Sequence, residues 1–219
     1  MISLAEENYL KNIYKLSEKN SGAVTTSSLA DALQINAASV TDFVKKMAEK
    51  KMVTYQKSKG AMLTEAGKKI ALKIIRKHRL WEVWLVNTLN FKWDEVHDIA
   101  EQLEHVNSDM LIERLDNHLG NPTADPHGDL IPDAKGKFIK DRSKPLLKCI
   151  AKQKVKFIGV AEHSNSFLQF LTKNNLKIGD ELFIERIEAY DQSFHLKINK
   201  KTKKVFSKEV VKNILIVLA

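Results

Sequence analysis

The sequence is poor in the residues that build disulfide-bonded or glycine-rich folds. Only one of its 219 residues is a cysteine, Cys149, which excludes an internal disulfide and a multi-cysteine zinc cluster. Glycine (8) and proline (4) are scarce, which favours helices. The longest apolar runs, such as 214–219, are far too short to span a bilayer. Glu6 and Glu7 stand where a signal peptide carries Lys or Arg, so we expect a cytoplasmic protein without a membrane partner.

Positive charge is in excess, but it is unevenly distributed. Lys and Arg number 36 against 27 Asp and Glu, and this net charge of +9 indicates a polyanionic partner. Residues 1–80 carry 15 basic and 7 acidic side chains (net +8), residues 81–131 carry 2 and 11 (net −9), and residues 132–219 carry 19 and 9 (net +10). Such sorting indicates separate domains. The acidic middle also holds four of the seven histidines, which suits a cation.

The first 64 residues have the pattern of a winged helix-turn-helix. Apolar spacing predicts three helices, followed by two short strands around the turn Lys57–Gly60. The third helix, which starts after Asn36, would lie in the major groove, with lysines at the phosphates. The alternative is a generic helical domain with solvated lysines. The candidate DNA-contacting residues are Thr26, Ala37, Ala38, Ser39, Thr41, Asp42, Lys45, Lys46, Lys57 and Lys59.

The remainder of the chain changes from helical to β-like patterns. Helices are predicted at about 65–89, 94–105 and 109–119. Residues 121–148, which hold all four prolines, are predicted to form a loop and linker. Short apolar runs then predict a small, mostly β unit with strands at 155–160, 181–187, 194–198 and 214–218 and a short helix at 166–172.

Histidines and carboxylates recur at helical spacing in the acidic segment. One predicted helix carries four of them at i, i+4, i+7 and i+8, and the preceding helix carries an i, i+4 pair. Burying such faces is costly unless the carboxylates gain a cation, and oxygen-rich sites with imidazole suit Mn(II) or Fe(II). The alternative is a solvated helix face. The helix predicted at 94–105 carries His97, Glu101, Glu104 and His105. The preceding helix, predicted at 65–89, carries His78 and Glu82.

Specific short motifs recur along residues 4–132. They are Glu7-Asn8-Tyr9-Leu10 with Ile13-Tyr14, Arg76-Lys77-His78-Arg79-Leu80 with Glu82, Val96-His97-Asp98, Glu101-x-x-Glu104-His105-Val106-x-Ser108-Asp109, Gly120-Asn121-Pro122 and Gly128-x-x-Ile131-Pro132. Together they resemble the DtxR/MntR family of metal-dependent transcriptional repressors. Residues 155–219 look like the SH3-like (FeoA-type) domain of the same family.

The resemblance implies a mainly α protein with a small β domain, in three parts. These are a winged helix-turn-helix domain (1–73), a helical metal-binding and dimerisation domain with linker (74–145) and a C-terminal SH3-like β-barrel (146–219). It also implies a homodimeric repressor of metal-uptake genes that binds a palindromic operator when loaded with metal. The apolar stripe at 80–89 and the helix at 109–119 would form the dimer interface, or else an ordinary core.

The resemblance also implies two metal sites. His78, Glu82 and His97 fall on one ligand set, whereas Glu101, Glu104 and His105 fall on the other, which Asn8 of the first helix completes. A shared cation there would fix the DNA-binding unit relative to the following one. Glutamate at position 101 is typical of manganese-type members, so Mn(II) is favoured and Fe(II) stays an alternative. Lys11 replaces a carboxylate ligand of some members, and His163 of the third domain is a further candidate ligand.

Two other functional classes compete with a repressor. A metal-dependent hydrolase would use the same Glu and His faces, but the sequence has neither a nucleophile elbow nor a phosphate loop, so we do not expect an enzyme. An adaptor or membrane-surface protein would use the basic run at 200–204, which is more typical of a solvated β-turn.

Overall fold

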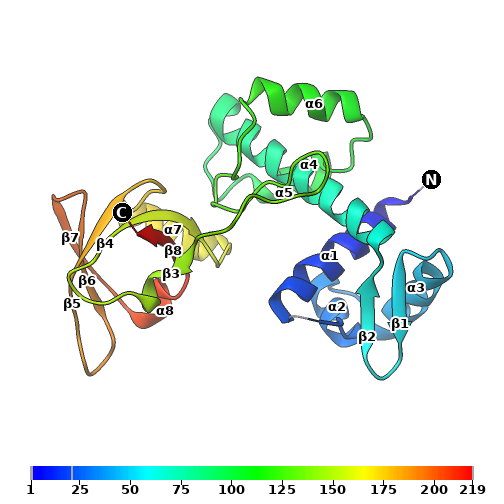
Figure 1. Ribbon diagram of the computed structural model, residues 1–219, viewed down its shortest axis with the longest axis horizontal. Coiled ribbons are helices and arrows are strands. Elements are labelled where there is room, and N and C mark those ends of the chain that lie inside the picture. Colours follow the sequence, from blue (N-terminus) through cyan, green and yellow to red (C-terminus); the bar gives the residue numbers. More distant parts are fainter. Residues whose placement is uncertain (1, 21, 219) are drawn as a thin grey trace. The chain divides into compact units, whose positions relative to one another are not determined.

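The computed structural model describes residues 2–20 and 22–218 (Figure 1). The chain divides into two compact units, described separately below. The N-terminal unit consists of Met1–His78, Gln102–Ser108 and Pro132–Lys137, and the C-terminal unit consists of Arg79–Glu101, Asp109–Ile131 and Phe138–Ala219. The predicted fold class, mainly helical with a small β domain, is confirmed. The three-domain division with boundaries after 73 and 145 stays a prediction.

Three helices and a β-hairpin form most of the N-terminal unit, as the sequence predicts. The two strands pair antiparallel, with Val53 opposite Leu63 and Gln56 opposite Gly60. Fully buried apolar side chains from each helix form the core, among them Leu10, Leu29 and Val44. The elements are α1 (Leu4–Asn20), α2 (Thr26–Leu33), α3 (Ala37–Glu49), β1 (Val53–Gln56) and β2 (Gly60–Leu63) (Figure 1).

Local hydrogen bonds explain where these helices begin. At α1, the backbone N–H of Ser3 donates to Glu6 Oε2 (2.9 Å) and the N–H of Glu6 donates to Ser3 Oγ (3.3 Å), which is a reciprocal capping box. At α3, the Oδ1 of Asn36 accepts a hydrogen bond from the N–H of Ala38 at 2.7 Å. Helix α3 therefore begins at Ala37, and the side chains of its first turn are exposed.

The hairpin turn closes against the loop before α2. Val24 and Ala61 exchange two backbone hydrogen bonds of 2.8 Å. Gly60 has a positive φ of +100°, and a Cβ there would come within 2.3 Å of the Val24 carbonyl oxygen. Only glycine satisfies both the backbone conformation and this close approach. These contacts fix the turn end of the hairpin against the loop before α2.

A long helix continues from the hairpin and carries residues of both units. It is α4 (Glu65–Leu89), and its predicted bounds are confirmed. The next two helices are α5 (His97–Leu103) and α6 (Asp109–His118). The prediction of one helix over 94–105 is wrong at both ends, since α5 has only seven residues. The described residues include no helix with the length and hydropathy needed to cross a membrane.

A six-stranded antiparallel sheet dominates the end of the chain, in the order β3-β8-β4-β5-β6-β7. Buried Phe157, Phe194 and Phe206 contribute to its core. The sheet is SH3-like, but its strand order is open rather than a closed barrel. Strand β7 was not predicted; it overlaps the basic run at 200–204, which was predicted to form a turn. The bounds are β3 (Lys144–Pro145), β4 (Lys154–Val160), α7 (Asn165–Lys173), β5 (Glu181–Ile187), β6 (Phe194–Ile198), β7 (Thr202–Phe206), α8 (Lys208–Val211) and β8 (Ile214–Leu218), with a 3₁₀ turn at Leu146–Lys148.

Candidate metal centre

A buried carboxylate on α4 lies between two histidines of the C-terminal unit. The Glu82 side chain is 2% exposed. Its Oε1 lies 3.5 Å from His97 Nδ1 of α5, and its Oε2 lies 3.6 Å from His127 Nδ1 in the loop after α6. Three segments that are distant in the sequence therefore meet at one buried carboxylate. Burying a carboxylate costs free energy, so its burial here is not explained by hydrophobic packing.

A second buried carboxylate, Asp125, completes this group. Its Oδ1 accepts hydrogen bonds from the backbone N–H groups of His127 (2.8 Å) and Asp129 (3.0 Å), so the loop itself fixes the carboxylate. Ligand atoms of Glu82, Asp125 and His127 lie within 4.8 Å of one another, and all three residues are buried. We call these three residues the Glu82 centre. Two carboxylates and an imidazole are donors that suit Mn(II) or Fe(II).

The orientation of His127 is that of a metal-binding histidine. Its Nε2 lies 2.8 Å from the carbonyl oxygen of Trp93, and because a carbonyl oxygen only accepts, Nε2 carries the proton and donates. The other ring nitrogen, Nδ1, faces Glu82 and Asp125. A histidine whose second nitrogen donates to a backbone carbonyl is the usual arrangement around a bound metal ion.

The Glu82 centre has an excess of negative charge. Burial raises the pKa of Asp125 to about 7, and the charges of Glu82 and Asp129 add to this rise. Burial by itself lowers the pKa of His127, but the interactions with Glu82 and Asp125 outweigh it and raise that pKa to about 9. Both directions indicate a site in which additional positive charge is favourable. These donors and this charge fit a divalent cation.

The loop of His127 also contacts the sheet-bearing part of the C-terminal unit. Asp129 Oδ2 lies 3.1 Å from Arg79 Nη2 of α4 and 3.6 Å from His163 Nε2, in the segment between β4 and α7. The rings of His127 and His163 meet edge to face with centroids 5.3 Å apart. His163 is thus adjacent to the Glu82 centre, with 40% of its side chain exposed. Its role as a ligand stays a prediction.

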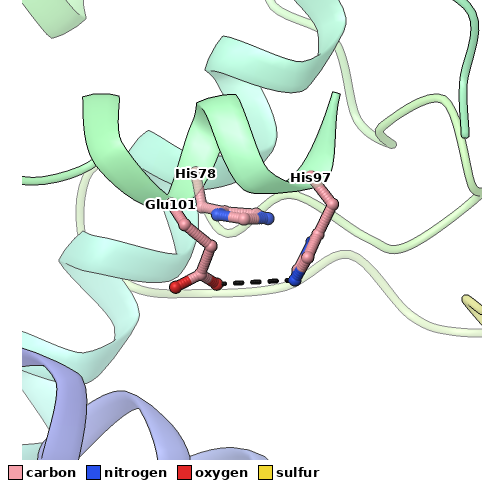
Figure 2. A group of neighbouring side chains, drawn as sticks. All are labelled: His78, His97 and Glu101. Carbon is pink, nitrogen blue, oxygen red and sulfur yellow. Dashed lines mark ion pairs between the residues drawn. The ribbon is translucent and has the colours of Figure 1, made fainter. Parts of the chain in front are cut away.

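Figure 2 shows three of the predicted ligands, His78 and His97 from one predicted set and Glu101 from the other. His97 and Glu101 lie one turn apart on α5, with 3.6 Å between His97 Nε2 and Glu101 Oε1. His78 comes from α4, one turn before Glu82 (Figure 2). A metal site shared by His78, Glu82 and His97 stays a prediction.

The other predicted ligand set is arranged differently. Helix α5 ends at Leu103, so Glu104 and His105 do not share a helix face with Glu101 as predicted. In the N-terminal unit, Glu104 Oε1 lies 2.5 Å from Lys11 Nζ. Glu104 Oε2 lies 2.7 Å from His78 Nδ1.

Two further residues of α1 lie in this neighbourhood of the N-terminal unit. His105 Nδ1 lies 2.6 Å from Glu7 Oε2. The Oδ1 of Asn8 is buried and has no hydrogen-bond partner among the described residues. A shared cation at Asn8, Glu101, Glu104 and His105 stays a prediction.

Sequence reasoning missed Asp125 and His127 as candidate ligands. It searched for donors at helical spacing, whereas these two residues lie in a loop that tertiary contacts bring to α4. One signal was available, because Asp125-Pro126-His127-Gly128 places two donors and two turn residues together in the acidic segment.

The predicted DNA-contacting residues lie on α2, on α3 and in the hairpin turn. Ala37, Ala38 and Ser39 are exposed in the first turn of α3, and Thr26 begins α2. Thr41 donates its Oγ1 hydrogen to the Ala37 carbonyl at 2.9 Å. The charged residues of this surface are all exposed: Asp42, Lys45, Lys46, Lys57 and Lys59.

Two family models match consecutive parts of the chain. Residues 1–61 match the iron-dependent repressor N-terminal DNA-binding domain, and residues 64–133 match the iron-dependent repressor metal-binding and dimerisation domain. The chain belongs to the iron-dependent repressor family. The predicted resemblance is therefore confirmed, and the Glu82 centre draws Glu82, Asp125 and His127 from the part matched to the metal-binding and dimerisation domain.

Individual known proteins are similar over much or nearly all of the chain. A solved manganese-dependent transcriptional repressor in complex with manganese is 29% identical, with a TM-score of 0.86 over 98% of this chain and 100% of that chain. The manganese regulator SloR is 32% identical, with a TM-score of 0.75 over 98% of both chains. The iron-dependent repressor IdeR of Mycobacterium tuberculosis is 35% identical over 58% of this chain. The chain spans about half (54%) of the length of that curated relative.

Replacing Gly128 of this repressor-family protein by alanine is expected to weaken the binding of Mn(II) by about 10- to 100-fold. Gly128 follows His127 and has a φ of +90°, and a Cβ there would come within 2.2 Å of the Ile158 carbonyl oxygen. The loop would have to leave β4, where Val160 N–H donates to the His127 carbonyl at 2.9 Å. Calorimetric titration with Mn(II) measures the effect.

A second glycine serves as a control that distinguishes the steric clash of an added Cβ from the strain of a positive φ. Gly179 has a φ of +100°, but nothing lies within 4 Å of the position of an added Cβ. Gly179→Ala should therefore leave the Mn(II) affinity unchanged. Equal affinities for the Gly128→Ala protein and the wild type would show that this loop does not hold the metal ligands.

Proposed function

We propose that this protein is a metal-activated transcriptional repressor that binds a palindromic operator as a homodimer when it is loaded with Mn(II). The single observation that carries the proposal is the Glu82 centre, in which two buried carboxylates and an oriented histidine lie within 4.8 Å of one another. It supports a resident cation in a chain whose N-terminal part belongs to a DNA-binding domain family. The regulated genes would serve metal uptake.

Mn(II) is the proposed metal, with Fe(II) as the alternative. The Glu82 centre offers carboxylate oxygens and imidazole, and the only cysteine, Cys149, lies buried in the core of the sheet. Without a thiolate there is little preference for Zn(II) or Cu(I). His97 and Glu101, which lie 3.6 Å apart on α5, offer the same kinds of donor. A bound cation supplies the positive charge that the two carboxylates of the Glu82 centre lack.

The residues around the Glu82 centre hold its donors in position. The Trp93 carbonyl orients the ring of His127, and backbone N–H groups orient the Asp125 carboxylate. Arg79 Nε lies 3.7 Å from the other oxygen of Asp125. Because His127 and Asp125 already have orienting partners, these two donors need little reorganisation when a cation binds.

The proposed DNA surface is the exposed first turn of α3 together with the hairpin turn. Small side chains at Ala37 and Ala38 permit close approach to base edges, while Ser39 and Thr41 offer hydrogen bonds. Lys45, together with Lys46, Lys57 and Lys59, would contact phosphates, which positions the protein without reading sequence. We propose a cytoplasmic regulator rather than an enzyme.

The proposed dimer interface uses the end of α4 and α6. Leu89 is 47% exposed on α4, and Met110 (64%) and Leu111 (39%) are exposed on α6. Part of the predicted stripe is core instead, since Leu80 and Leu115 are buried within the chain. Exposed apolar side chains on these two helices support the proposal that a second copy covers them.

Metal-dependent DNA binding tests this function. A duplex selected from a random pool by the Mn(II)-loaded protein serves as the probe for an electrophoretic shift. We expect its affinity to rise by about 5- to 150-fold when Mn(II) is added, which is the usual range of coupling between two sites. Equal affinity with and without metal would contradict the switch, and failure to select any duplex would contradict DNA recognition.

A further inference from the structure

A lysine lies where the family resemblance implies a metal ligand. Lys11, in the middle of α1, is 2% exposed although lysine is almost never fully buried unless it is paired. Its Nζ lies 2.5 Å from Oε1 of Glu104, a carboxylate that is itself 0% exposed. Both residues belong to the N-terminal unit. A buried ammonium therefore meets a buried carboxylate directly.

Both oxygens of Glu104 already have partners. Oε1 lies beside the Lys11 ammonium, and Oε2 lies 2.7 Å from Nδ1 of His78. A buried carboxylate is costly unless its charge is balanced and its oxygens accept hydrogen bonds, and this one has both. Within its own surroundings, Glu104 does not require a metal ion.

Another residue implied as a ligand, His105, lies beside both Glu104 and Glu7. His105 directs Nδ1 toward Glu7 Oε2 at 2.6 Å, and its Nε2 lies 3.8 Å from Glu104 Oε1. Glu101 belongs to the C-terminal unit, where it pairs with His97. The buried Oδ1 of Asn8 is a single neutral donor, which is too little for a divalent ion without the Glu104 carboxylate. With the Glu104 oxygens beside Lys11 and His78, the members of the implied set in the N-terminal unit do not fit a metal ion.

We propose that Lys11 is the permanent cation of this cluster and that its ammonium takes the place of a second metal ion. The ion pair ties α1 to the segment of Glu104 whether or not metal is present. Glu6 of the same helix also lies beside Lys50 at the end of α3, with 2.5 Å between Oε1 and Nζ. Helix α1 is thus held to both neighbours by lysines, and the response to metal is left to the Glu82 centre.

A charge-neutral double variant tests the proposal, which rests on the proposed function in requiring that the protein bind Mn(II). Lys11→Met with Glu104→Gln removes both buried charges and keeps the side-chain sizes, an exchange that is often tolerated. Free Mn(II) is counted by electron paramagnetic resonance during titration of the full chain. We expect the same number of Mn(II) ions per chain and the same affinity as in the wild type.

The controls separate the possible failures. Glu18→Gln with Lys19→Met makes the same exchange at exposed positions of α1 and should also leave Mn(II) binding unchanged. Loss of one Mn(II) equivalent, or at least tenfold weaker binding, only in the buried double variant would overturn the proposal and leave the proposed function intact. A wild-type chain that binds no Mn(II) would overturn the proposed function and this inference with it.

A measurement on the wild type covers the case in which the double variant does not fold. In protein labelled with ¹⁵N at lysine, the buried Lys11 ammonium should give a slowly exchanging signal. We expect that signal to persist at saturating Zn(II), a diamagnetic probe. Its disappearance on metal addition would show that the metal displaces Lys11 from Glu104, which overturns the proposal.

Discussion

Replacing Glu82 by glutamine is expected to weaken Mn(II) binding by more than about 100-fold, beyond the usual cost of losing an orienting partner. Glu82 is the buried residue that faces both His97 and His127, one with each carboxylate oxygen. Glutamine keeps the size but removes the charge and places an N–H₂ group against one of the imidazoles. Calorimetric titration measures the affinity for Mn(II).

The same substitution should remove the effect of Mn(II) on DNA binding while leaving metal-free DNA binding as in the wild type. Glu113→Gln on the exposed face of α6 is the matched control, since it removes the same charge at a residue that is not a candidate ligand. If Glu82→Gln and Glu113→Gln bind Mn(II) equally well, the Glu82 centre is not the metal site.

Replacing Lys45 and Lys46 by alanine is expected to reduce the salt dependence of DNA binding. Each lysine that neutralises a phosphate contributes about 0.9 to the slope of log affinity against log salt concentration. Losing both should therefore lower the magnitude of that slope by about 1.8. Both side chains are exposed on α3, where Lys45 Nζ lies 3.6 Å from Asp42 Oδ1. Shift titrations between low and physiological salt give the slope.

A second pair of lysines controls for net charge. Lys200 and Lys201 are exposed in the turn between β6 and β7, and their replacement by alanine changes the net charge of the chain by the same amount. This variant should keep the wild-type slope. An equal change in both double variants would show that α3 is not the DNA-contacting element and that the basic surplus acts only through the overall charge.

The sequence predicted the DNA-binding part of the fold closely because local signals determine it. The capping residue Asn36, the apolar spacing of α3 and the turn before Gly60 each act within a few residues. Helix α5 was predicted too long because the helical spacing of side chains in the sequence continues from Asp94 past Glu104. In the structure, residues 94–96 form turns, and Glu104 lies beyond the helix end with its carboxylate beside Lys11.

The candidate site was predicted only where helical spacing carries the information. His78 and Glu82 share a face of α4, and His97 and Glu101 lie one turn apart on α5, so their proximity follows from the helix. Asp125, like His127, reaches Glu82 through tertiary contacts of a loop, which no periodicity reports. The burial of Lys11 against Glu104 is likewise invisible in sequence, where a lysine on an amphipathic helix appears solvated.

The most direct test of the account measures Mn(II) affinity with and without the selected duplex. If metal at the Glu82 centre favours the DNA-binding form, then DNA must strengthen Mn(II) binding by the same factor by which Mn(II) strengthens DNA binding. We predict equal factors in the two titrations, both close to one in the Glu82→Gln protein. An Mn(II) affinity that is the same with and without the duplex would contradict a metal-activated repressor.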